Sequence, residues 1–331
     1  MNLFFAATEK LKKREPFCLV RIPGQEVELF DSFHQTPLEG AKQFVCKPWR
    51  ANTTPSYYAK GDNEMQAEDC QRKPHETSYD EYKNSFDLCM TELESNRLQK
   101  VVLSRVFCTE SSSPPSLIAI FQRAASKYPD ALVYLLLHPD EGIWIGASPE
   151  ILLKKRKSSL ETVSLAGTQQ AYEGNYEWGD KEKAEQAYVS DHIRSALRNL
   201  NCTIQEELGP DTIEAGKVAH LKTRFLFSSE TKITELLEHL HPTPAIAGVP
   251  TDKAIQQIEK TERHERGLYT GYLGVYDSEK ADIYVNLRCM QIVAKSFYLY
   301  LGGGITKDSE LDKEWLETEY KAKTLLNLLN E

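Results

Sequence analysis

The chain has 331 residues, of which 40% are hydrophobic and 27% charged, a composition that suits a globular protein with a large core. Its 40 lysines and arginines are outnumbered by 49 aspartates and glutamates, so the net charge is −9, and no basic stripe is visible. This balance excludes a typical nucleic-acid-binding protein. A small anionic ligand would therefore need local positive charge from Arg, Lys or a metal ion.

The sequence also bears on location. No apolar run approaches the ~18 residues of a membrane span, and the apolar start Met1–Ala7 is too short for a signal peptide. The seven cysteines are scattered without a Cys-x-x-Cys pair, which disfavours a zinc site or a disulfide framework. We expect buried thiols at Cys89 and Cys289, a reducing cytoplasm and no membrane partner.

The predicted elements begin with strands over residues 16–34 and a long polar surface loop or mobile connection over residues 48–78. A capping box at Ser78–Glu81 starts a helix that ends near Asn96. The later elements are a strand from Lys100, a helix over 116–127, a hairpin of 132–137 and 142–146, a helix over 180–200 with a buried stripe (Ala184, Ala187, Tyr188, Ile193, Leu197), an antiparallel pair of strands over 283–288 and 297–301, and a helix over 312–329. This mixture predicts an α+β fold with antiparallel sheets.

Two ionisable side chains lie at the edges of apolar strand-like segments. Lys100 opens such a segment, and burial lowers the pKa of a lysine, so that it can act as a general base. Glu150 follows Gly146-Ala147-Ser148-Pro149, and an apolar setting raises the pKa of a carboxyl, which favours a proton donor. Taken singly, each is more often a solvated residue. Together at one pocket, they would form an acid–base pair.

Other residues could bind a ligand or a metal ion. Glu185 and Glu317 lie on two predicted helices, and their oxygens would suit Mg²⁺. Arg288 could contact a carboxylate, and Tyr269 could donate from its hydroxyl. Gly302-Gly303-Gly304 would let backbone amides approach an anion. For the glutamates and Arg288 the commoner roles are a surface glutamate and a paired arginine, whereas a packing tyrosine and a flexible turn are as common as the binding roles.

Two loops with small residues and hydroxyls, Leu165–Thr168 and His241–Gly248, would also allow close approach to a ligand. The sequence contains no nucleophile elbow, Walker loop, dinucleotide fingerprint or His-Glu-x-x-His motif. None of the single motifs identifies the chemistry, and the evidence lies in their order.

In that order the motifs closely resemble those of the chorismate-utilising enzymes, namely isochorismate, salicylate, anthranilate and aminodeoxychorismate synthases. The resemblance runs from about residue 78 to the C-terminus and rests on eight motifs: Lys100–Arg105, Gly146–Glu150, Leu165–Thr168, the helix with Glu185, His241–Ala245, Leu287-Arg288, Gly302–Ile305 and Glu314–Glu317. It implies a fold like anthranilate synthase component I, with large antiparallel sheets stacked in a sandwich, helices outside and the site in a deep cleft. It further implies one chorismate-binding catalytic domain over residues 1–331, in which residues 1–77 are a strand-rich N-terminal part and 78–331 the motif-bearing core.

The resemblance also assigns roles. Mg²⁺ would be held by Glu185 and Glu317 and would bind the ring carboxylate of chorismate. Arg288 and Tyr269 would hold the pyruvyl carboxylate, helped by amides of the glycine run. The further substrate-binding positions that it implies are Thr168, His241, Gly302, Gly303, Gly304 and Lys321.

Three positions favour water over ammonia as the nucleophile. Members that add water resemble this chain in having a lysine at position 100, whereas ammonia-using members typically carry glutamine there. Ala166 stands where the aminodeoxychorismate type has lysine, and Gly248–Thr251 differs from the Gly-Ala-Pro-Lys of aminating members. The resemblance thus implies an isochorismate synthase, with Lys100 as the base for water attacking ring C2 and Glu150 as the acid for the C4 hydroxyl. We expect a monomer without a glutamine amidotransferase subunit.

Two alternatives stay open. A salicylate synthase would add water in the same way and then eliminate pyruvate, and the sequence separates the two poorly. A non-catalytic chorismate-binding protein would be expected to have lost catalytic positions, yet Lys100, Glu150, Glu185 and Glu317 are all present. The product could feed menaquinone or a catechol siderophore, and menaquinone is the predicted use.

Overall fold

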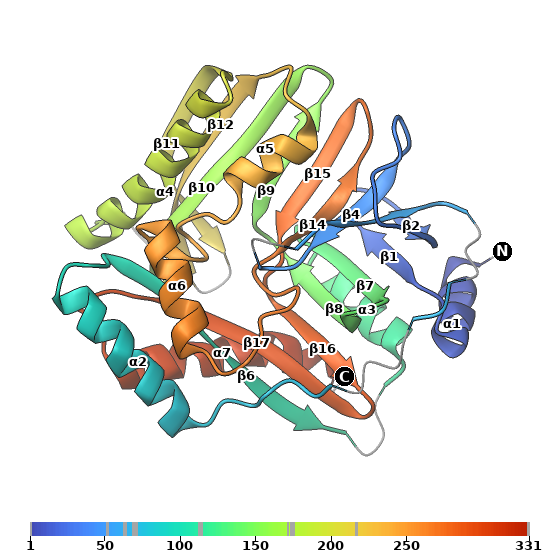
Figure 1. The fold of residues 1–331 in the computed structure, drawn as a ribbon, viewed down its shortest axis with the longest axis horizontal. Coiled ribbons are helices and arrows are strands. Elements are labelled where there is room, and N and C mark those ends of the chain that lie inside the picture. Colours follow the sequence, from blue (N-terminus) through green and yellow to red (C-terminus); the bar gives the residue numbers. More distant parts are fainter. Residues whose placement is uncertain are drawn as a thin grey trace.

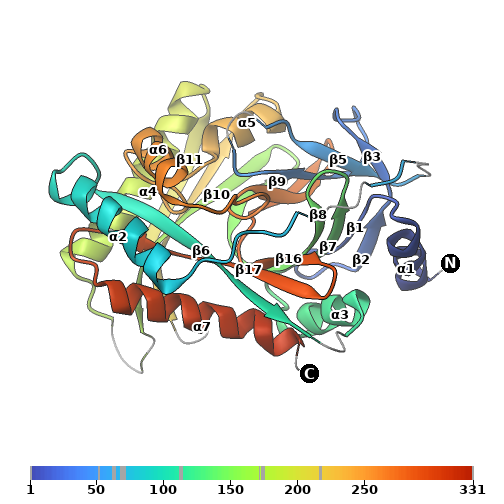
Figure 2. The same ribbon diagram turned by 60° about the horizontal axis from the view of Figure 1, so that its bottom comes forward.

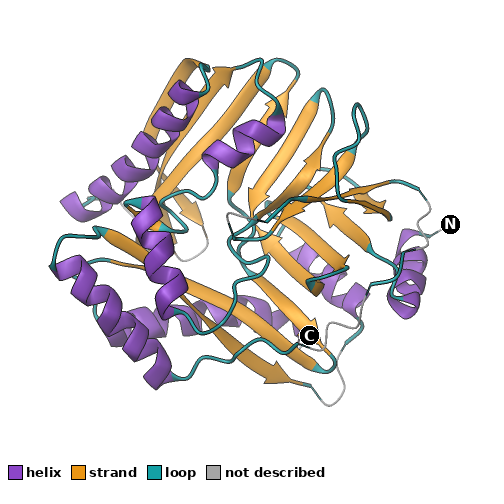
Figure 3. Ribbon diagram, in the orientation of Figure 1, coloured by secondary structure: helices purple, strands orange, loops and turns teal. Residues whose placement is uncertain are grey.

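The structure is a computed structural model that describes residues 2–50, 53–61, 65–67, 72–111, 115–170, 172, 176–215 and 218–329. Two large sheets lie at its centre, with helices on the outside (Figures 1 and 3). Neighbouring strands are antiparallel wherever their pairing is described, as along β17 and β6. The predicted α+β sandwich is confirmed.

One sheet has eight strands and the other nine. The eight-stranded sheet has the order β13 (Gly248–Val249), β6 (Lys100–Glu110), β17 (Ser296–Ile305), β16 (Cys289–Val293), β8 (Gly142–Ser148), β7 (Leu132–His138), β1 (Phe17–Arg21) and β2 (Val27–Phe30). The nine-stranded sheet has the order β11 (Thr203–Ala215), β12 (Val218–Ser228), β10 (Ser159–Gln170), β9 (Ile151–Arg156), β15 (Lys280–Val285), β14 (Tyr272–Tyr276), β4 (Gln43–Lys47), β5 (Ser56–Ala59) and β3 (Ser32–His34). Strands before residue 60 therefore pair into both sheets.

The helices of the described residues are α1 (Leu3–Lys13), α2 (Tyr79–Glu94), α3 (Leu117–Lys127), α4 (Asp180–Asn199), α5 (Ile233–Leu240), α6 (Thr251–Thr261) and α7 (Leu311–Leu329). Helices α1, α3 and α7 share an apolar cluster with the outer face of the eight-stranded sheet. Helices α2, α4, α5 and α6 share another with the nine-stranded sheet and with β6. None of the described helices is long and apolar enough to cross a membrane.

The apolar layer between the sheets follows from strand alternation, because successive side chains point to opposite faces. Tyr134 and Trp144 from the eight-stranded sheet share this cluster with Phe44 and Leu273 from the nine-stranded sheet. Cys289 belongs to the same layer and, as predicted, is fully buried; Cys89, on the inner face of α2, is also buried.

Several predicted elements are confirmed close to their expected bounds. The hydroxyl of Ser78 accepts from the amide of Glu81, and the Glu81 carboxylate accepts from the Ser78 amide, which is the predicted capping box. Ser116 caps α3 in a similar way. These signals are local, so they do not depend on how the sheets pack.

The predicted buried stripe of α4 is only partly right. Ile193 and Leu197 are buried, but Ala187 is exposed, and Ala184 and Tyr188 are only partly buried. The helix instead turns Gln186 and Ser190 toward the sheet. The Ser190 and Ser164 hydroxyls are 2.8 Å apart, and the Gln186 amide donates to Ser164 Oγ at 2.6 Å. A polar contact that the apolar pattern does not reveal has set the orientation of the helix.

The predicted pairing of residues 283–288 with 297–301 is wrong. Strand β15 ends at Val285 and pairs with β14 and β9 in the nine-stranded sheet, whereas β17 pairs with β16 and β6 in the other. Residues 286–288 cross between the sheets, so Arg288 does not lie on a strand. The predicted loop over 48–78 is also interrupted, because Ser56–Ala59 forms β5 beside β4.

A buried charged network ties β6 to the segment before β14. The Glu262 carboxylate accepts from the Ser104 amide and hydroxyl, each at 2.8 Å, and from the Arg266 guanidinium at 2.7 and 2.8 Å. Arg266 also donates to the Val102 carbonyl at 2.7 Å and lies over the ring of Trp49. Because each charge has a partner and further hydrogen bonds, the network can hold this segment at a fixed place against β6.

Candidate active site

The run Gly302–Gly304 is the point on which the predicted site residues converge. The sequence left open a flexible turn here, but the run is the end of β17. It pairs with Val102–Ser104 of β6. Strand β16 pairs only with residues 296–299, so no described strand covers the other edge of the run. A Cβ on Gly302 would lie 2.7 Å from the Tyr269 hydroxyl, and one on Gly304 would lie 2.7 Å from Lys100 Cε. Only glycine allows these side chains to approach so closely.

Lys100 is the first residue of β6 and is 6% exposed. The start of β6 is fixed by the short strand β13, with Val249 as the pairing partner of Lys100. The Lys100 chain lies against Gly304, and its Nζ is 3.5 Å from Glu185 Oε2 on α4. The structure thus brings two predicted site residues, a base candidate and a carboxylate, into contact.

Glu150 lies at the corner between β8 and β9. The Ser148 hydroxyl donates to the Leu287 carbonyl at 2.9 Å and accepts from the Leu287 amide at 3.1 Å, while the Val285 amide donates to the Glu150 carbonyl at 2.9 Å. These bonds hold the corner against the chain that crosses between the sheets.

The surroundings of Glu150 suit a proton donor. Part of its surface still reaches solvent, but protein atoms crowd the carboxyl. Desolvation raises the pKa of Glu150 to about 7, and the positive charge of nearby Lys100 acts in the opposite direction. A carboxyl with this pKa is protonated in a large fraction of molecules at neutral pH. The expected base and acid therefore lie within electrostatic reach of each other.

Tyr269 lies beside this pair. Its ring is buried and stacks on Tyr300, with centroids 5.6 Å apart, and its hydroxyl is directed at Gly302. Burial raises its pKa well above the usual range, and the negative charge of Glu150 adds to the effect. The hydroxyl therefore keeps its proton and can serve as a hydrogen-bond donor.

Two carboxylates of α7 lie over the middle glycine. A Cβ on Gly303 would be 3.2 Å from Glu314 Oε2 and 3.7 Å from Glu317 Oε1. Lys321 Nζ donates to the Gly302 carbonyl at 2.7 Å and is 2.6 Å from Glu317 Oε1. Sequence analysis missed Glu314, although its spacing of three residues from Glu317 places both on one helix face.

The donor set at this place fits a hard cation. Burial raises the pKa of Glu314, and the negative charge of Glu317 raises it further. A divalent ion would relieve that repulsion and prefers oxygen ligands. The part of the chain that is described contains no group of three or more His, Cys, Asp or Glu side chains placed to hold a metal ion. Carboxylates of α4 and α7, together with substrate or water oxygens, would have to complete the coordination.

Arg288 lies at the rim of this arrangement. It sits between β15 and β16 with a φ of +48°, a left-handed conformation that non-glycine residues seldom adopt and that is enriched at functional sites. His220 on β12, which sequence analysis missed, is 3.2 Å from the Gly167 carbonyl through Nδ1. Burial lowers the pKa of His220 and the Gly167 carbonyl raises it, while the charges of Lys321, Arg288 and Glu317 have smaller effects. No motif pointed to His220.

In the loop after α5, His241 lies behind the residues at the glycine run, next to the backbone that follows Tyr269. His241 is buried, and its Nε2 is 2.7 Å from the Thr270 carbonyl, so it packs behind Tyr269. Burial lowers the His241 pKa to about 4, which keeps the ring neutral. The Thr243 hydroxyl is buried without a hydrogen bond to any described residue. The side chain of Thr168 lies outside the described residues.

A family model described as a chorismate binding enzyme matches residues 16–330. The chain belongs to the chorismate-binding enzyme family. Isochorismate synthase MenF of Escherichia coli (strain K12) is 30% identical over 256 residues, covering 74% of this chain and 59% of MenF. Isochorismate synthase EntC of the same organism is 29% identical over 244 residues, covering 70% of this chain and 62% of EntC. The chain thus spans less than two thirds of these relatives' own length.

Solved structures of the chorismate-binding enzyme family share the fold. The menaquinone-specific isochorismate synthase MenF from Escherichia coli superposes with a TM-score of 0.79 at 20% identity, over 96% of this chain and 89% of that one. Anthranilate synthase component I from Streptococcus pneumoniae gives a TM-score of 0.71 at 16% identity, over 94% and 92%. The expected likeness to anthranilate synthase component I is confirmed.

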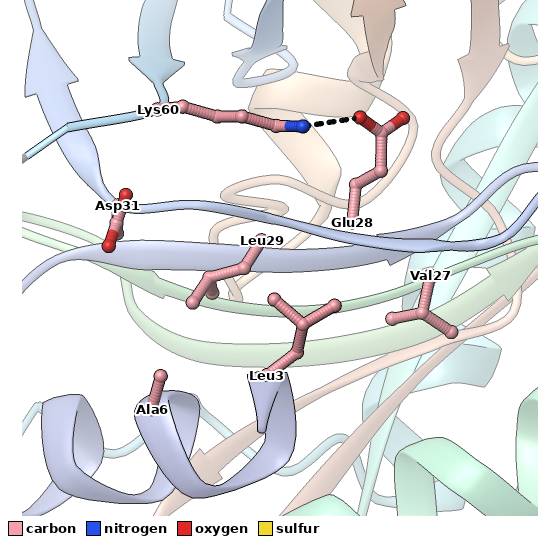
Figure 4. A pocket seen from close by; sticks show the side chains of 7 residues that line it. All are labelled: Leu3, Ala6, Val27, Glu28, Leu29, Asp31 and Lys60. Carbon is pink, nitrogen blue, oxygen red and sulfur yellow. Dashed lines mark ion pairs between the residues drawn. The ribbon is translucent and has the colours of Figure 1, made fainter. Parts of the chain in front are cut away.

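A pocket of about 290 Å³ lies elsewhere, between α1 and the edge strand β2 (Figure 4). It is lined by Leu3, Ala6, Val27, Glu28, Leu29, Asp31 and Lys60, with Lys60 Nζ 3.0 Å from Glu28 Oε2. Strand β2 and the end of β6 that carries Lys100 belong to opposite sides of the eight-stranded sheet. None of the predicted site residues lines this pocket.

The raised pKa of Glu150 predicts a pH-dependent effect on stability. The pKa of this carboxyl is about 7 in the folded protein and 4.5 when unperturbed. Its contribution to the free energy of unfolding is therefore fully present below pH 4.5 and is lost as the pH rises through 7. Glu150→Gln stays neutral and avoids this loss. We expect it to be more stable than wild type by up to about 3 kcal/mol above pH 7, with the gain shrinking toward pH 4.5. Urea unfolding at several pH values measures this, and a pH-independent difference would contradict the assigned environment.

Proposed function

We propose that the protein is an isochorismate synthase, which converts chorismate to isochorismate by adding water at ring C2 and releasing the C4 hydroxyl. The observation that carries this proposal is the position of Lys100 against the glycine run, with Glu150, whose pKa is about 7, close enough to feel the charge of Lys100. The relatives named isochorismate synthase support it. A lysine at position 100 favours water over ammonia.

The first step would use Lys100 as general base. After losing its own proton, Lys100 accepts one from the water that attacks C2. Its position against Gly304 keeps the amine at the uncovered edge of β17. Glu185, 3.5 Å from Nζ, orients the amine and is available to bind a cation.

The second step would use Glu150 as general acid. As the ring double bonds shift, Glu150 donates its proton to the departing C4 oxygen, which leaves as water. Water enters at one carbon and leaves from another, so the reaction is an isomerisation and consumes no redox equivalent.

We further propose that Glu185 and Glu317 hold Mg²⁺. When bound, the ion would offset the ring carboxylate charge of chorismate. Arg288 and the Tyr269 hydroxyl would bind the pyruvyl carboxylate, and Lys321 would add positive charge. Thr168, His241 and the glycine run complete the proposed binding site. This local positive charge is what an acidic protein needs to bind a dianion.

We propose that residues 1–331 form one catalytic domain, because β1–β5 pair into both sheets. The six described cysteines are free, which supports a reducing cytoplasm. We propose menaquinone as the product's use, since one structural neighbour is a menaquinone-specific synthase. We also propose that the protein is a monomer. No amidotransferase subunit is expected, because a reaction that uses water as the nucleophile needs no supply of ammonia.

Product analysis tests the proposal. Purified protein is incubated with chorismate and Mg²⁺, with and without ammonium, and products are separated by liquid chromatography and mass spectrometry. We expect isochorismate in both reactions and no aminated product. Salicylate and pyruvate accumulating from chorismate alone would instead identify a salicylate synthase, and no turnover would favour a chorismate-binding protein without catalysis.

Substitutions test the acid and the base. Lys100→Ala and Glu150→Gln should each lower kcat by about 10²–10⁴-fold, because each removes a proton transfer. Lys47→Ala is a control at another buried strand lysine, and Glu141→Gln is a control at a second carboxyl whose pKa burial raises to about 7. Both controls should retain turnover. Unchanged kcat in Lys100→Ala and Glu150→Gln would overturn the proposed roles.

A further inference from the structure

Tyr82 on α2 carries a buried hydroxyl without a described partner. The side chain is 1% exposed, and its oxygen makes no hydrogen bond with any described residue. Buried polar groups in proteins are nearly always hydrogen-bonded, so an exception calls for an explanation. The explanation must lie in what faces the hydroxyl.

The ring of Tyr82 is fixed against α7. Helices α2 and α7 pack together beside the strands β6 and β17 (Figures 1 and 2). The Tyr82 ring meets Trp315 edge-on, with centroids 5.4 Å apart. Trp315 is itself held by the Arg105 guanidinium, 3.8 Å from its ring centroid, and by the ring of Tyr79 at 5.2 Å. Tyr82 is thus packed against a Trp315 side chain that is itself held in place.

Two carboxylates lie on the same helix as the ring that Tyr82 contacts. Glu314 and Glu317 flank Trp315 in the sequence of α7, and after burial their charges are the main causes that raise the Tyr82 pKa, while Arg105 opposes them. The hydroxyl therefore keeps its proton. As a donor beside two acceptors, it has carboxylate oxygens as its natural partners.

Glu314 is the better placed of the two acceptors. Its Oε1 accepts from the Ser309 hydroxyl at 2.7 Å, while its Oε2 lies over Gly303. Glu317 is already paired with Lys321 at 2.6 Å. The negative charge of Glu314 has no lysine or arginine within ion-pair distance among the described residues.

We propose that Tyr82 is a positioning residue that donates its hydroxyl hydrogen bond to the Glu314 carboxylate and orients it when a divalent cation binds the acidic groups of α4 and α7. This inference rests on the Mg²⁺ of the proposed function. Groups that hydrogen-bond to metal-binding carboxylates fix their orientation, and their loss typically weakens metal binding about 10- to 100-fold. Tyr82 thereby links α2, which carries none of the proposed ligands, to the metal site.

Isothermal titration of the metal-free protein with MgCl₂ tests this proposal. Tyr82→Phe removes only the hydroxyl and should weaken Mg²⁺ binding about tenfold or more, without lowering the melting temperature of the metal-free protein. Tyr276→Phe is the matched control, because Tyr276 on β14 also has a buried hydroxyl without a described partner but lies in the other sheet. Its Mg²⁺ affinity should stay at the wild-type value.

A double substitution identifies the partner. If Tyr82 acts through Glu314, then Tyr82→Phe should cause no further loss in a Glu314→Gln background. Equal affinities in wild type and Tyr82→Phe, equal losses in Tyr82→Phe and Tyr276→Phe, or additive losses with Glu314→Gln would each overturn the proposal. The readout is separate from turnover: a protein that binds Mg²⁺ but does not convert chorismate would refute the proposed activity and leave this test intact. A wild-type protein that binds no Mg²⁺ would overturn the role of Tyr82.

Discussion

The candidate site depends on the absence of side chains at three successive positions of β17. At Gly302 a Cβ would collide with the Tyr269 hydroxyl, and at Gly304 it would collide with the Lys100 chain. The bare backbone lets a strand, a loop and the helix α7 approach one place from different directions. Pairing with β6 keeps the run extended and rigid, while its other edge has no described strand. A fixed frame of this kind suits catalysis, because groups placed in advance need not reorganise during the reaction.

Opposed charges then determine what the groups can do. Lys100 lies near Glu185 on one side and lowers the pKa of Glu150 on the other, while burial raises that pKa more strongly. The result is a carboxyl that can give a proton at neutral pH, within reach of the positive charge of Lys100. Behind this pair the Glu262–Arg266 network holds the segment with Tyr269 against β6. Lys100 and the hydrogen bonds of this network thus meet on one strand, β6.

Much of the frame could be predicted from the sequence, because its signals are local. The capping box of Ser78 and the apolar spacing of α2 identified that helix, and the order of motifs indicated the family fold. Contacts between residues far apart in the sequence could not be predicted in this way. The polar contact of Gln186 with Ser164 turned α4 away from its apolar pattern, and the crossing at 286–288 removed Arg288 from a strand. Glu314 was not named as a site residue although its motif was recognised, and His220 was missed because only the assembled fold brings it near the charges of Arg288 and α7.

The central claim is that water enters the ring at one carbon and leaves from another. The most direct measurement is mass spectrometry and NMR of the product formed from chorismate in ¹⁸O-labelled water with Mg²⁺. The account predicts isochorismate that carries one labelled oxygen, located at C2, with loss of the original C4 oxygen. An unlabelled product, a label at another carbon, or labelled salicylate with free pyruvate would contradict it.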